Sequence, residues 1–138
     1  MTAYTYDEDI YSDLYKETFG MRPRGDEFYA ATPERKQQIW DTLMRMHAQA
    51  MEEHRAMQER GAKEFELAVT KSIMCGAKDR ETAIRWMVEA LPEWVYHDHL
   101  GYLEYEYDLP YGYLREYRPI QEHAEAAAQL AYQQESMQ

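Results

Sequence analysis

The residues best suited to bind a metal in this sequence are His97, Asp98 and His99, which follow one another without a gap. Imidazole nitrogens and carboxylate oxygens are usual ligands of zinc and other transition metals. Two histidines two positions apart share a face of a strand, but on a helix they point about 200° apart and cannot reach one ion. Because we expect a helix here, the pattern favours a partly exposed helix surface, and we expect no metal or other cofactor.

The cysteine and two further histidines show no familiar catalytic arrangement. Cys75 has no activating motif beside it, and its place before Gly76 indicates packing at a helix end. His47 and His54 lie seven residues apart near one helical face, as partly buried core or interface imidazoles do. The sequence also lacks a phosphate-binding glycine loop, a nucleophile elbow and a dinucleotide fingerprint. We therefore expect a protein that is not an enzyme.

The sharpest functional signal is a region rich in tyrosine and carboxylate groups, residues 96–117. Seven of the 13 tyrosines fall there, and residues 93–112 carry five acidic side chains and no basic one. Tyrosine supplies a large contact area at low entropic cost, while carboxylates complement a basic partner. The alternative is a tyrosine-rich packing layer with a solvated acidic rim. We expect eight residues to form a partner-binding surface: Tyr102, Glu104, Tyr105, Glu106, Tyr107, Asp108, Tyr111 and Tyr113.

The net charge of −11 is unevenly distributed along the chain. Residues 21–92 carry twelve acidic and twelve basic side chains, so the acidity belongs to the two ends of the sequence. Binding to a nucleic-acid backbone requires a cluster of basic side chains, and the sequence holds none. We expect no direct contact with nucleic acid. The predicted partner is a protein with a basic surface, of the nucleic-acid-binding kind, for which a row of carboxylates imitates phosphates.

These residues need a helical framework, and its main part is one long helix predicted over residues 33–75. Thr32 is a suitable N-cap, Pro33 is tolerated at the first helical position, and Gly76 can end the helix in the left-handed conformation. Such a helix spans roughly 64 Å, too long for one small globule to cover. Ten residues of this helix follow an eleven-residue repeat and therefore lie on one face, which we call the stripe. They are Ile39, Leu43, Met46, Ala50, His54, Met57, Gly61, Phe65, Ala68 and Ser72.

The length of this helix leaves two outcomes. Either the helix bends or folds back near Gly61, or its stripe packs against a partner, in which case we expect a homodimer. If Gly61 only bends the helix, alanine there is tolerated or stabilising by about 1 kcal/mol, the difference in helix propensity. If Gly61→Ala unfolds the protein, residues 33–75 form a helical hairpin.

Shorter helices are predicted on both sides of the long one. Apolar spacing predicts a helix over residues 10–19 that ends at Gly20. Asp79 is a plausible N-cap for a helix that ends near Pro92, and Pro119 can open a final helix of high alanine content. These elements, with the long helix, give an all-α fold of four to five helices.

One further segment allows two interpretations. Residues 102–109 alternate between apolar and acidic side chains, as a half-buried strand does. We favour a helix over about 94–107, because a lone hairpin is poorly stable in water. The chain is then a single helical domain, residues 1–138, whose ends at 1–9 and 135–138 are expected to fray.

Three local signatures carry a family resemblance: Tyr11–Lys16 followed by Gly20–Gly25, then Gly76–Trp86, then Leu109–Gly112. Together they resemble a group of small helical proteins encoded by tailed phages and prophages, a group without an assigned activity. Asp108 stands where the resembling sequences tend to have glycine, which makes the helix end there less secure. The resemblance implies a viral or mobile-element origin and action on a bacterial host, and it carries over no catalytic residue.

The sequence therefore favours a protein that binds another protein. The resemblance implies a phage-encoded inhibitor or modulator of a host protein, with anti-defence activity such as CRISPR inhibition as its most specific form. The alternative is a structural or assembly protein of the phage particle that uses the long helix as an oligomer seam. The single cysteine, and a sequence without a signal peptide or membrane span, predict a cytoplasmic location in the host cell.

Overall fold

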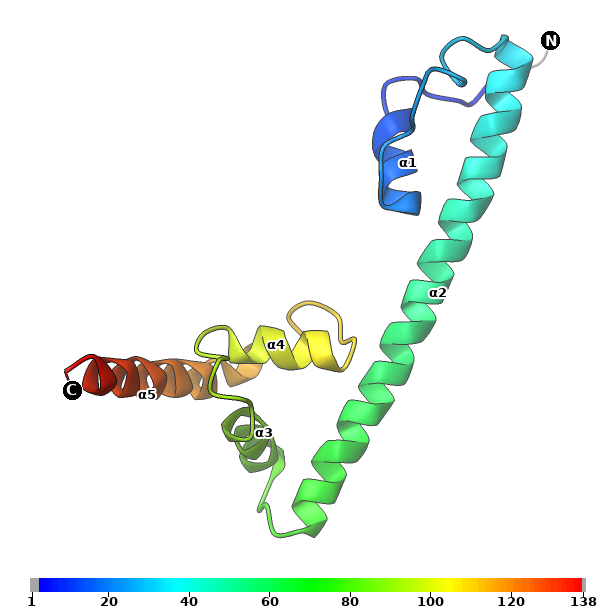
Figure 1. Cartoon of the computed structure of the whole chain (residues 1–138). Helices are drawn as coiled ribbons and strands as arrows, with labels where there is room; N and C mark the ends of the chain where they lie inside the picture. Colours follow the sequence, from blue (N-terminus) through cyan, green and yellow to red (C-terminus); the bar gives the residue numbers. More distant parts are fainter. Residues whose placement is uncertain (1–2, 138) are drawn as a thin grey trace. The chain divides into compact units, whose positions relative to one another are not determined.

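The computed structural model describes residues 3–137, and all regular structure in this range is helical (Figure 1). The helices are α1 (Tyr11–Phe19), α2 (Pro33–Met74), α3 (Arg80–Glu89), α4 (His99–Glu106), the 3-10 helix η1 (Arg115–Tyr117) and α5 (Arg118–Ser136). The prediction of an all-α fold organised on one long helix is confirmed. The chain packs as two compact units, Met1–Arg55 and Ala56–Gln138, and α2 contributes to both.

The ends of α2 follow from its sequence. Thr32 Oγ1 accepts a hydrogen bond from the backbone N–H of Arg35 at 3.3 Å, which is the predicted N-cap contact. Beyond Met74, the last helical residue, Gly76 has a φ of 120° that favours glycine. α2 continues through Gly61, so these residues form one helix and not a helical hairpin.

The first unit packs α1, the loop after it and the N-terminal part of α2 around an aromatic cluster. Tyr11, Phe28, Trp40 and Leu43 are buried in this cluster. The rings of Tyr11 and Phe28 stack with their centroids 3.9 Å apart. Gly20, with a φ of 82°, ends α1 as predicted.

The N-terminal segment lies along α2. The side-chain oxygen of Gln37 accepts hydrogen bonds from the backbone N–H groups of Thr5 and Tyr6, at 2.8 and 3.3 Å. Within the segment expected to fray, residues 1–9, these two bonds tie the backbone of Thr5 and Tyr6 to the long helix. The first two residues lie outside the described range.

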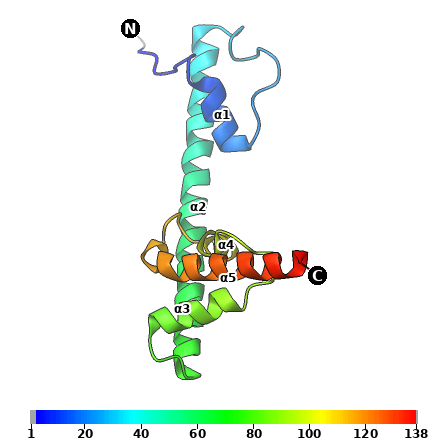
Figure 2. The ribbon, with the colours of Figure 1, turned by 90° about the vertical axis from the view of Figure 1, so that its left-hand side faces the viewer.

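The second unit packs α3, α4 and α5 with the C-terminal part of α2. Two views at right angles show α3 and α5 side by side (Figure 2). Asp79 caps α3 as predicted, since its Oδ1 accepts a hydrogen bond from the backbone N–H of Thr82 at 2.8 Å. Apolar side chains from the helices and their connecting segments form the core of this unit: Phe65, Val69, Ala77, Ala83, Ile84, Val88, Leu100, Leu103, Leu109, Leu114 and Ile120.

The ambiguous segment is helical, and α4 is shorter than predicted. The helix expected over about 94–107 begins only at His99, because Asp98 takes a left-handed conformation with a φ of 48° and caps α4. Its Oδ1 accepts a hydrogen bond from the backbone N–H of Gly101 at 3.3 Å. The backbone N–H of Asp98 donates to Glu125 at 2.7 Å, which ties the turn before α4 to α5.

The final helix opens at the predicted place. Pro119 lies in its first turn, where a missing N–H costs little. α5 then continues to Ser136, so it includes residues 135 and 136 of the segment expected to fray, 135–138. Gln138 lies outside the described residues.

Gly61 packs against the backbone that follows α4. It is buried, and a Cβ built on it would lie 1.8 Å from the carbonyl oxygen of Tyr107. That separation is far below a van der Waals contact, so something must shift. The expectation that alanine is tolerated or stabilising at this position is therefore wrong. The role of Gly61 is close approach between two chain segments, which helix propensity alone does not show.

Candidate protein-binding surface

The predicted surface lies on α4 and on the turn after it, and a buried carboxylate joins these two parts. Glu104 is only 7% exposed. Its Oε1 accepts a hydrogen bond from the backbone N–H of Gly112 at 3.3 Å, and its Oε2 accepts one from that of Leu114 at 2.9 Å. Glu104 therefore holds the turn against α4. The prediction that it faces a partner is wrong, because its oxygens are already used inside the fold.

Two of the predicted tyrosines belong to the packing layer that was the alternative interpretation. The rings of Tyr107 and Tyr113 both meet Phe65 edge to face, with centroids 5.3 and 5.9 Å away. Both tyrosines are only partly exposed. Tyr113 Oη donates a hydrogen bond to Glu66 at 2.6 Å, and this bond raises the pKa of Tyr113. Neither ring is a free anchor for a partner.

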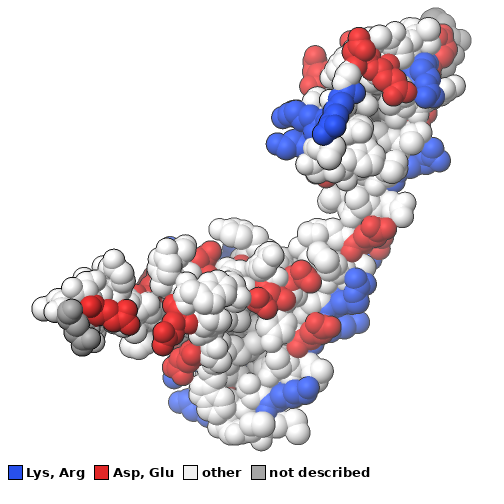
Figure 3. All heavy atoms as spheres, viewed as in Figure 1, with Lys and Arg blue, Asp and Glu red and all other residues white. Residues whose placement is uncertain are grey.

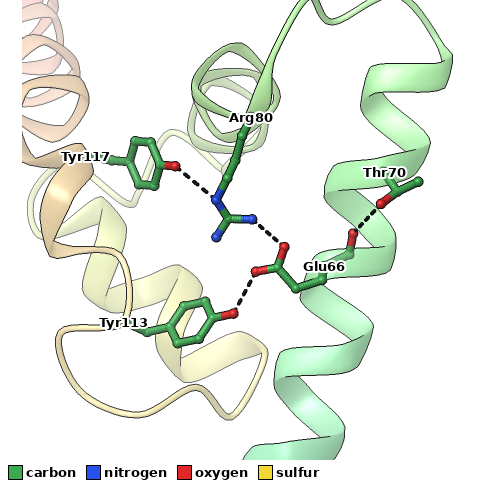
Figure 4. Close-up of polar contacts among 5 residues, drawn as sticks. All are labelled: Glu66, Thr70, Arg80, Tyr113 and Tyr117. Carbon is green, nitrogen blue, oxygen red and sulfur yellow. Dashed lines mark hydrogen bonds and ion pairs between the residues drawn. The ribbon is translucent and has the colours of Figure 1, made fainter.

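Tyr113 is part of a polar network that connects α2 and α3 to the segment after α4, which carries Tyr113 and Tyr117 (Figure 4). Glu66 on α2 forms an ion pair with Arg80 on α3, and Arg80 Nε donates a hydrogen bond to Tyr117 Oη at 3.0 Å. We call these four residues the Glu66–Arg80 cluster. Its members lie far apart in sequence and form no local motif, which is why sequence reasoning missed them.

Opposing effects set the pKa of the Glu66 carboxyl group. Burial raises its pKa, while hydrogen bonds from Arg80 and Tyr113 lower it, and the net result is a lowered pKa. The same carboxylate raises the pKa of Arg80. Both shifts favour the charged pair at neutral pH, so the cluster is an ionic fastening of the fold.

Four of the eight predicted residues remain available to a partner. Tyr105 is 79% exposed and Tyr111 is 98% exposed. Glu106 and Asp108 are exposed as well, and no Lys or Arg of residues 3–137 forms an ion pair with either. We call these four residues the exposed acidic surface. It lies at the C-terminal end of α4, where Glu104 positions the turn that carries Tyr111.

The eighth predicted residue, Tyr102, lies beside this surface. It is half-buried, and its ring meets Trp94 edge to face with centroids 5.3 Å apart. A hydrogen bond with Glu106 raises the pKa of Tyr102. Trp94 is 66% exposed, and sequence reasoning missed it because it was placed in a helix that begins only five residues later.

The residues considered for metal or thiol chemistry are scattered. His97 is exposed in the turn before α4, whereas His99 is 5% exposed and its Nδ1 has no hydrogen-bond partner among the described residues. Within residues 3–137, no three His, Cys, Asp or Glu side chains are grouped as a metal site requires. Cys75 is exposed, so the expectation that it packs at a helix end is wrong.

A groove elsewhere in the second unit includes none of the four residues of the exposed acidic surface. It is a groove of about 1510 Å³ between α3, the segment before α4 and α5, and we call it the α3–α5 groove. Its floor includes Ala127 and Ala131, and His99 also lines it. The signal in the sequence was the alanine-rich face of the final helix, which was interpreted only as high helix propensity.

Comparisons with protein-family models, with curated proteins and with solved structures find no match for this chain. Among the helices of residues 3–137, none has the length and apolar character needed to cross a membrane.

Proposed function

We propose that this protein acts by binding another protein through the exposed acidic surface, and that it is not an enzyme. The observation that carries the proposal is the exposure of Tyr105 and Tyr111, close in sequence to Glu106 and Asp108, which form no ion pair with a Lys or Arg of residues 3–137. Exposed aromatic rings are favoured anchors of interfaces, because they bury a large area with few rotatable bonds. Holding Tyr111 on a turn fixed by the buried Glu104 limits the entropy that binding must remove.

The chemistry of the surface indicates a basic partner. Residues 93–112 carry five acidic side chains and no basic one, and several carboxylates lie over α4 and α5 on the face drawn in Figure 3. Such a field speeds the approach of a cationic groove and disfavours nucleic acid itself. A protein that binds nucleic acid has such a groove, and carboxylates can occupy it as phosphates do.

The resemblance to phage-encoded proteins supports placing this partner in the cytoplasm of a bacterial host. On that basis the protein is an inhibitor or modulator of a host protein. Inhibition of a nucleic-acid-binding defence protein, as in CRISPR inhibition, is the most specific role that we propose.

The test combines capture of the partner with binding kinetics. Immobilised protein would capture the partner from a bacterial lysate, and the rates would be measured with purified components. Replacing Glu106 and Asp108 by Gln and Asn should slow association and flatten its salt dependence, because steering depends on charge. Tyr105→Ala or Tyr111→Ala should instead speed dissociation, because a desolvated anchor is lost.

Glu64→Gln serves as the matched control, since Glu64 is an exposed carboxylate on α2 outside this surface. It should leave both rates unchanged. If the Gln and Asn variant associates at the parental rate in both low and high salt, the exposed carboxylates serve only solubility.

A structural or assembly role remains the second candidate, and one observation favours it. Met46, a member of the stripe of α2, is 44% exposed in the first unit, and His54 of the same stripe is exposed as well. Flexible methionine side chains exposed on a helix are suited to an oligomer seam. The oligomeric state of the purified chain distinguishes this role from the first.

A further inference from the structure

The size of the α3–α5 groove points to a macromolecular occupant. Its volume of about 1510 Å³ exceeds the roughly 300–1,000 Å³ of typical small-molecule sites. A helix about 10 Å across fills roughly 400 Å³ per turn, so the groove can hold about three turns. Its walls are α3, the segment before α4 and α5, all within the second unit.

The floor of the groove suits close packing of a helix. Ile120 and Ala124 on α5 pack against the core of the second unit. The same face of α5 continues through Ala127, Ala128 and Ala131, which line the groove. Methyl side chains keep this surface shallow, so another helix can approach it closely.

His99 is a buried member of the groove wall. It lines the groove, is only 5% exposed, and its Nδ1 has no hydrogen-bond partner among the described residues. Buried polar atoms in folded proteins nearly always have a partner. Because Nδ1 itself is buried, it does not contact an occupant of the groove, and His99 serves as a reporter of binding.

The rim of the groove indicates the charge of the occupant. Arg85 is the only Lys or Arg among the lining residues, and it lies 3.7 Å from Glu81. The other lining carboxylates are Glu89, Glu93, Glu125 and Glu135. A second copy of α5 would bring three more acidic side chains and one basic one into this acidic rim, whereas a basic segment complements it.

We propose that the α3–α5 groove binds an amphipathic, basic helix of a partner protein. Small apolar side chains of that helix lie on the alanine floor, and lysine or arginine side chains meet the glutamate rim. This goes beyond the proposed function, because it assigns a separate contact site and the secondary structure of its ligand. The groove can bind its helix whether or not the exposed acidic surface is used.

The probe is a fluorescein-labelled synthetic peptide of about five helical turns, with leucine and alanine on one face and lysine on the other. Its binding to the full chain is measured by fluorescence anisotropy. Ala127→Arg places a long cationic side chain in the groove and should weaken binding at least about tenfold. Ala126→Arg is the matched control on α5: it adds the same charge at an exposed residue outside the groove and should leave affinity within about twofold.

Two further measurements address the place of binding and the exposed acidic surface. In protein carrying nitrogen-15 histidine, the ring resonances of His99 should shift on peptide addition, while those of His47 in the first unit should not. The double variant Tyr105→Ala, Tyr111→Ala should bind the peptide as the parental chain does. Peptide binding therefore tests the groove separately from the partner binding proposed for the exposed acidic surface.

Several results would overturn the proposal. One is equal binding of a peptide with glutamate in place of lysine, and another is an equal loss of affinity in the Ala127→Arg and Ala126→Arg variants. Absence of peptide binding would overturn it as well. Self-association of the chain that Ala127→Arg abolishes would show that the groove's occupant is a second copy.

Discussion

At the scale of single residues, Gly61 shows most directly how packing overrides helix propensity. Alanine would stabilise an isolated helix by about 1 kcal/mol at this position. Here its Cβ would lie 1.8 Å from the Tyr107 carbonyl oxygen, and relieving that overlap requires backbone movement. We therefore expect Gly61→Ala to lower the free energy of unfolding by about 1–3 kcal/mol, the usual cost of overpacking. Chemical denaturation followed by circular dichroism measures it.

The control for this prediction is Glu64→Ala, an exposed position on the same helix. It should change the free energy of unfolding by less than about 0.5 kcal/mol. A Gly61→Ala variant as stable as the parental chain would mean that α2 does not contact the backbone of Tyr107 in solution. A loss of stability, in contrast, would not imply a helical hairpin, since α2 is continuous through this residue.

Asp108 is a second residue at which the backbone sets the constraint. It has a φ of 55°, in the left-handed region that glycine adopts most readily. The end of α4 is nevertheless held, because the backbone N–H of Leu109 donates to the carbonyl oxygen of Glu104 at 2.8 Å. The departure from glycine noted in the sequence thus leaves a closed helix end, and it adds an exposed carboxylate three residues before Tyr111.

At the scale of elements, the Glu66–Arg80 cluster makes the stability of the second unit depend on pH. The pKa of Glu66 is lowered from its ordinary value of 4.5, so between its folded and unfolded pKa values the unfolded chain binds more protons. Stability therefore rises with pH in that window. The contribution is fully present above about pH 4.5 and is lost as pH falls through the folded pKa.

Glu66→Gln tests this dependence. The variant should be less stable than the parental chain at neutral pH, and the difference should shrink as the pH falls toward about 3. Urea denaturation at a series of pH values measures it, with Glu64→Gln as the exposed control. A difference that stays constant across the series would show that Glu66 acts through shape or hydrogen bonding, and not through its charge.

At the scale of the whole molecule, the open question is whether a second copy covers the stripe of α2. Within the stripe, Leu43 and Phe65 are buried inside their own units, whereas Met46 and His54 are exposed. A homodimer would cover such exposed positions by two-fold symmetry. We expect light scattering to give the mass of two chains, and Met46→Glu to shift it to one. If the mass is that of one chain at all concentrations, α2 forms no oligomer contact, and the proposed assembly role is excluded.

Much of the helical framework could be predicted from the sequence, because its determinants are local. Thr32 and Asp79 act as N-caps through hydrogen bonds that span only three residues. Gly20 and Gly76 end helices through their own backbone conformation. Helical spacing of apolar residues placed the long helix to within one residue of its observed end at Met74. The contacts of the N-terminal segment could not be predicted, because they join Thr5 and Tyr6 to Gln37, more than thirty residues away.

The candidate site depended much more on tertiary structure. Composition alone placed tyrosines and carboxylates in residues 96–117, but it could not tell which side chains the fold would use internally. Glu104 turned inward because the turn after α4 has backbone N–H groups that need acceptors, and Tyr113 turned inward toward Glu66. Local sequence thus determined which segments are helical, because caps and periodicity act over a few residues. Only tertiary structure decided which polar groups are left to a partner, because burial is a property of segments brought together from distant parts of the chain.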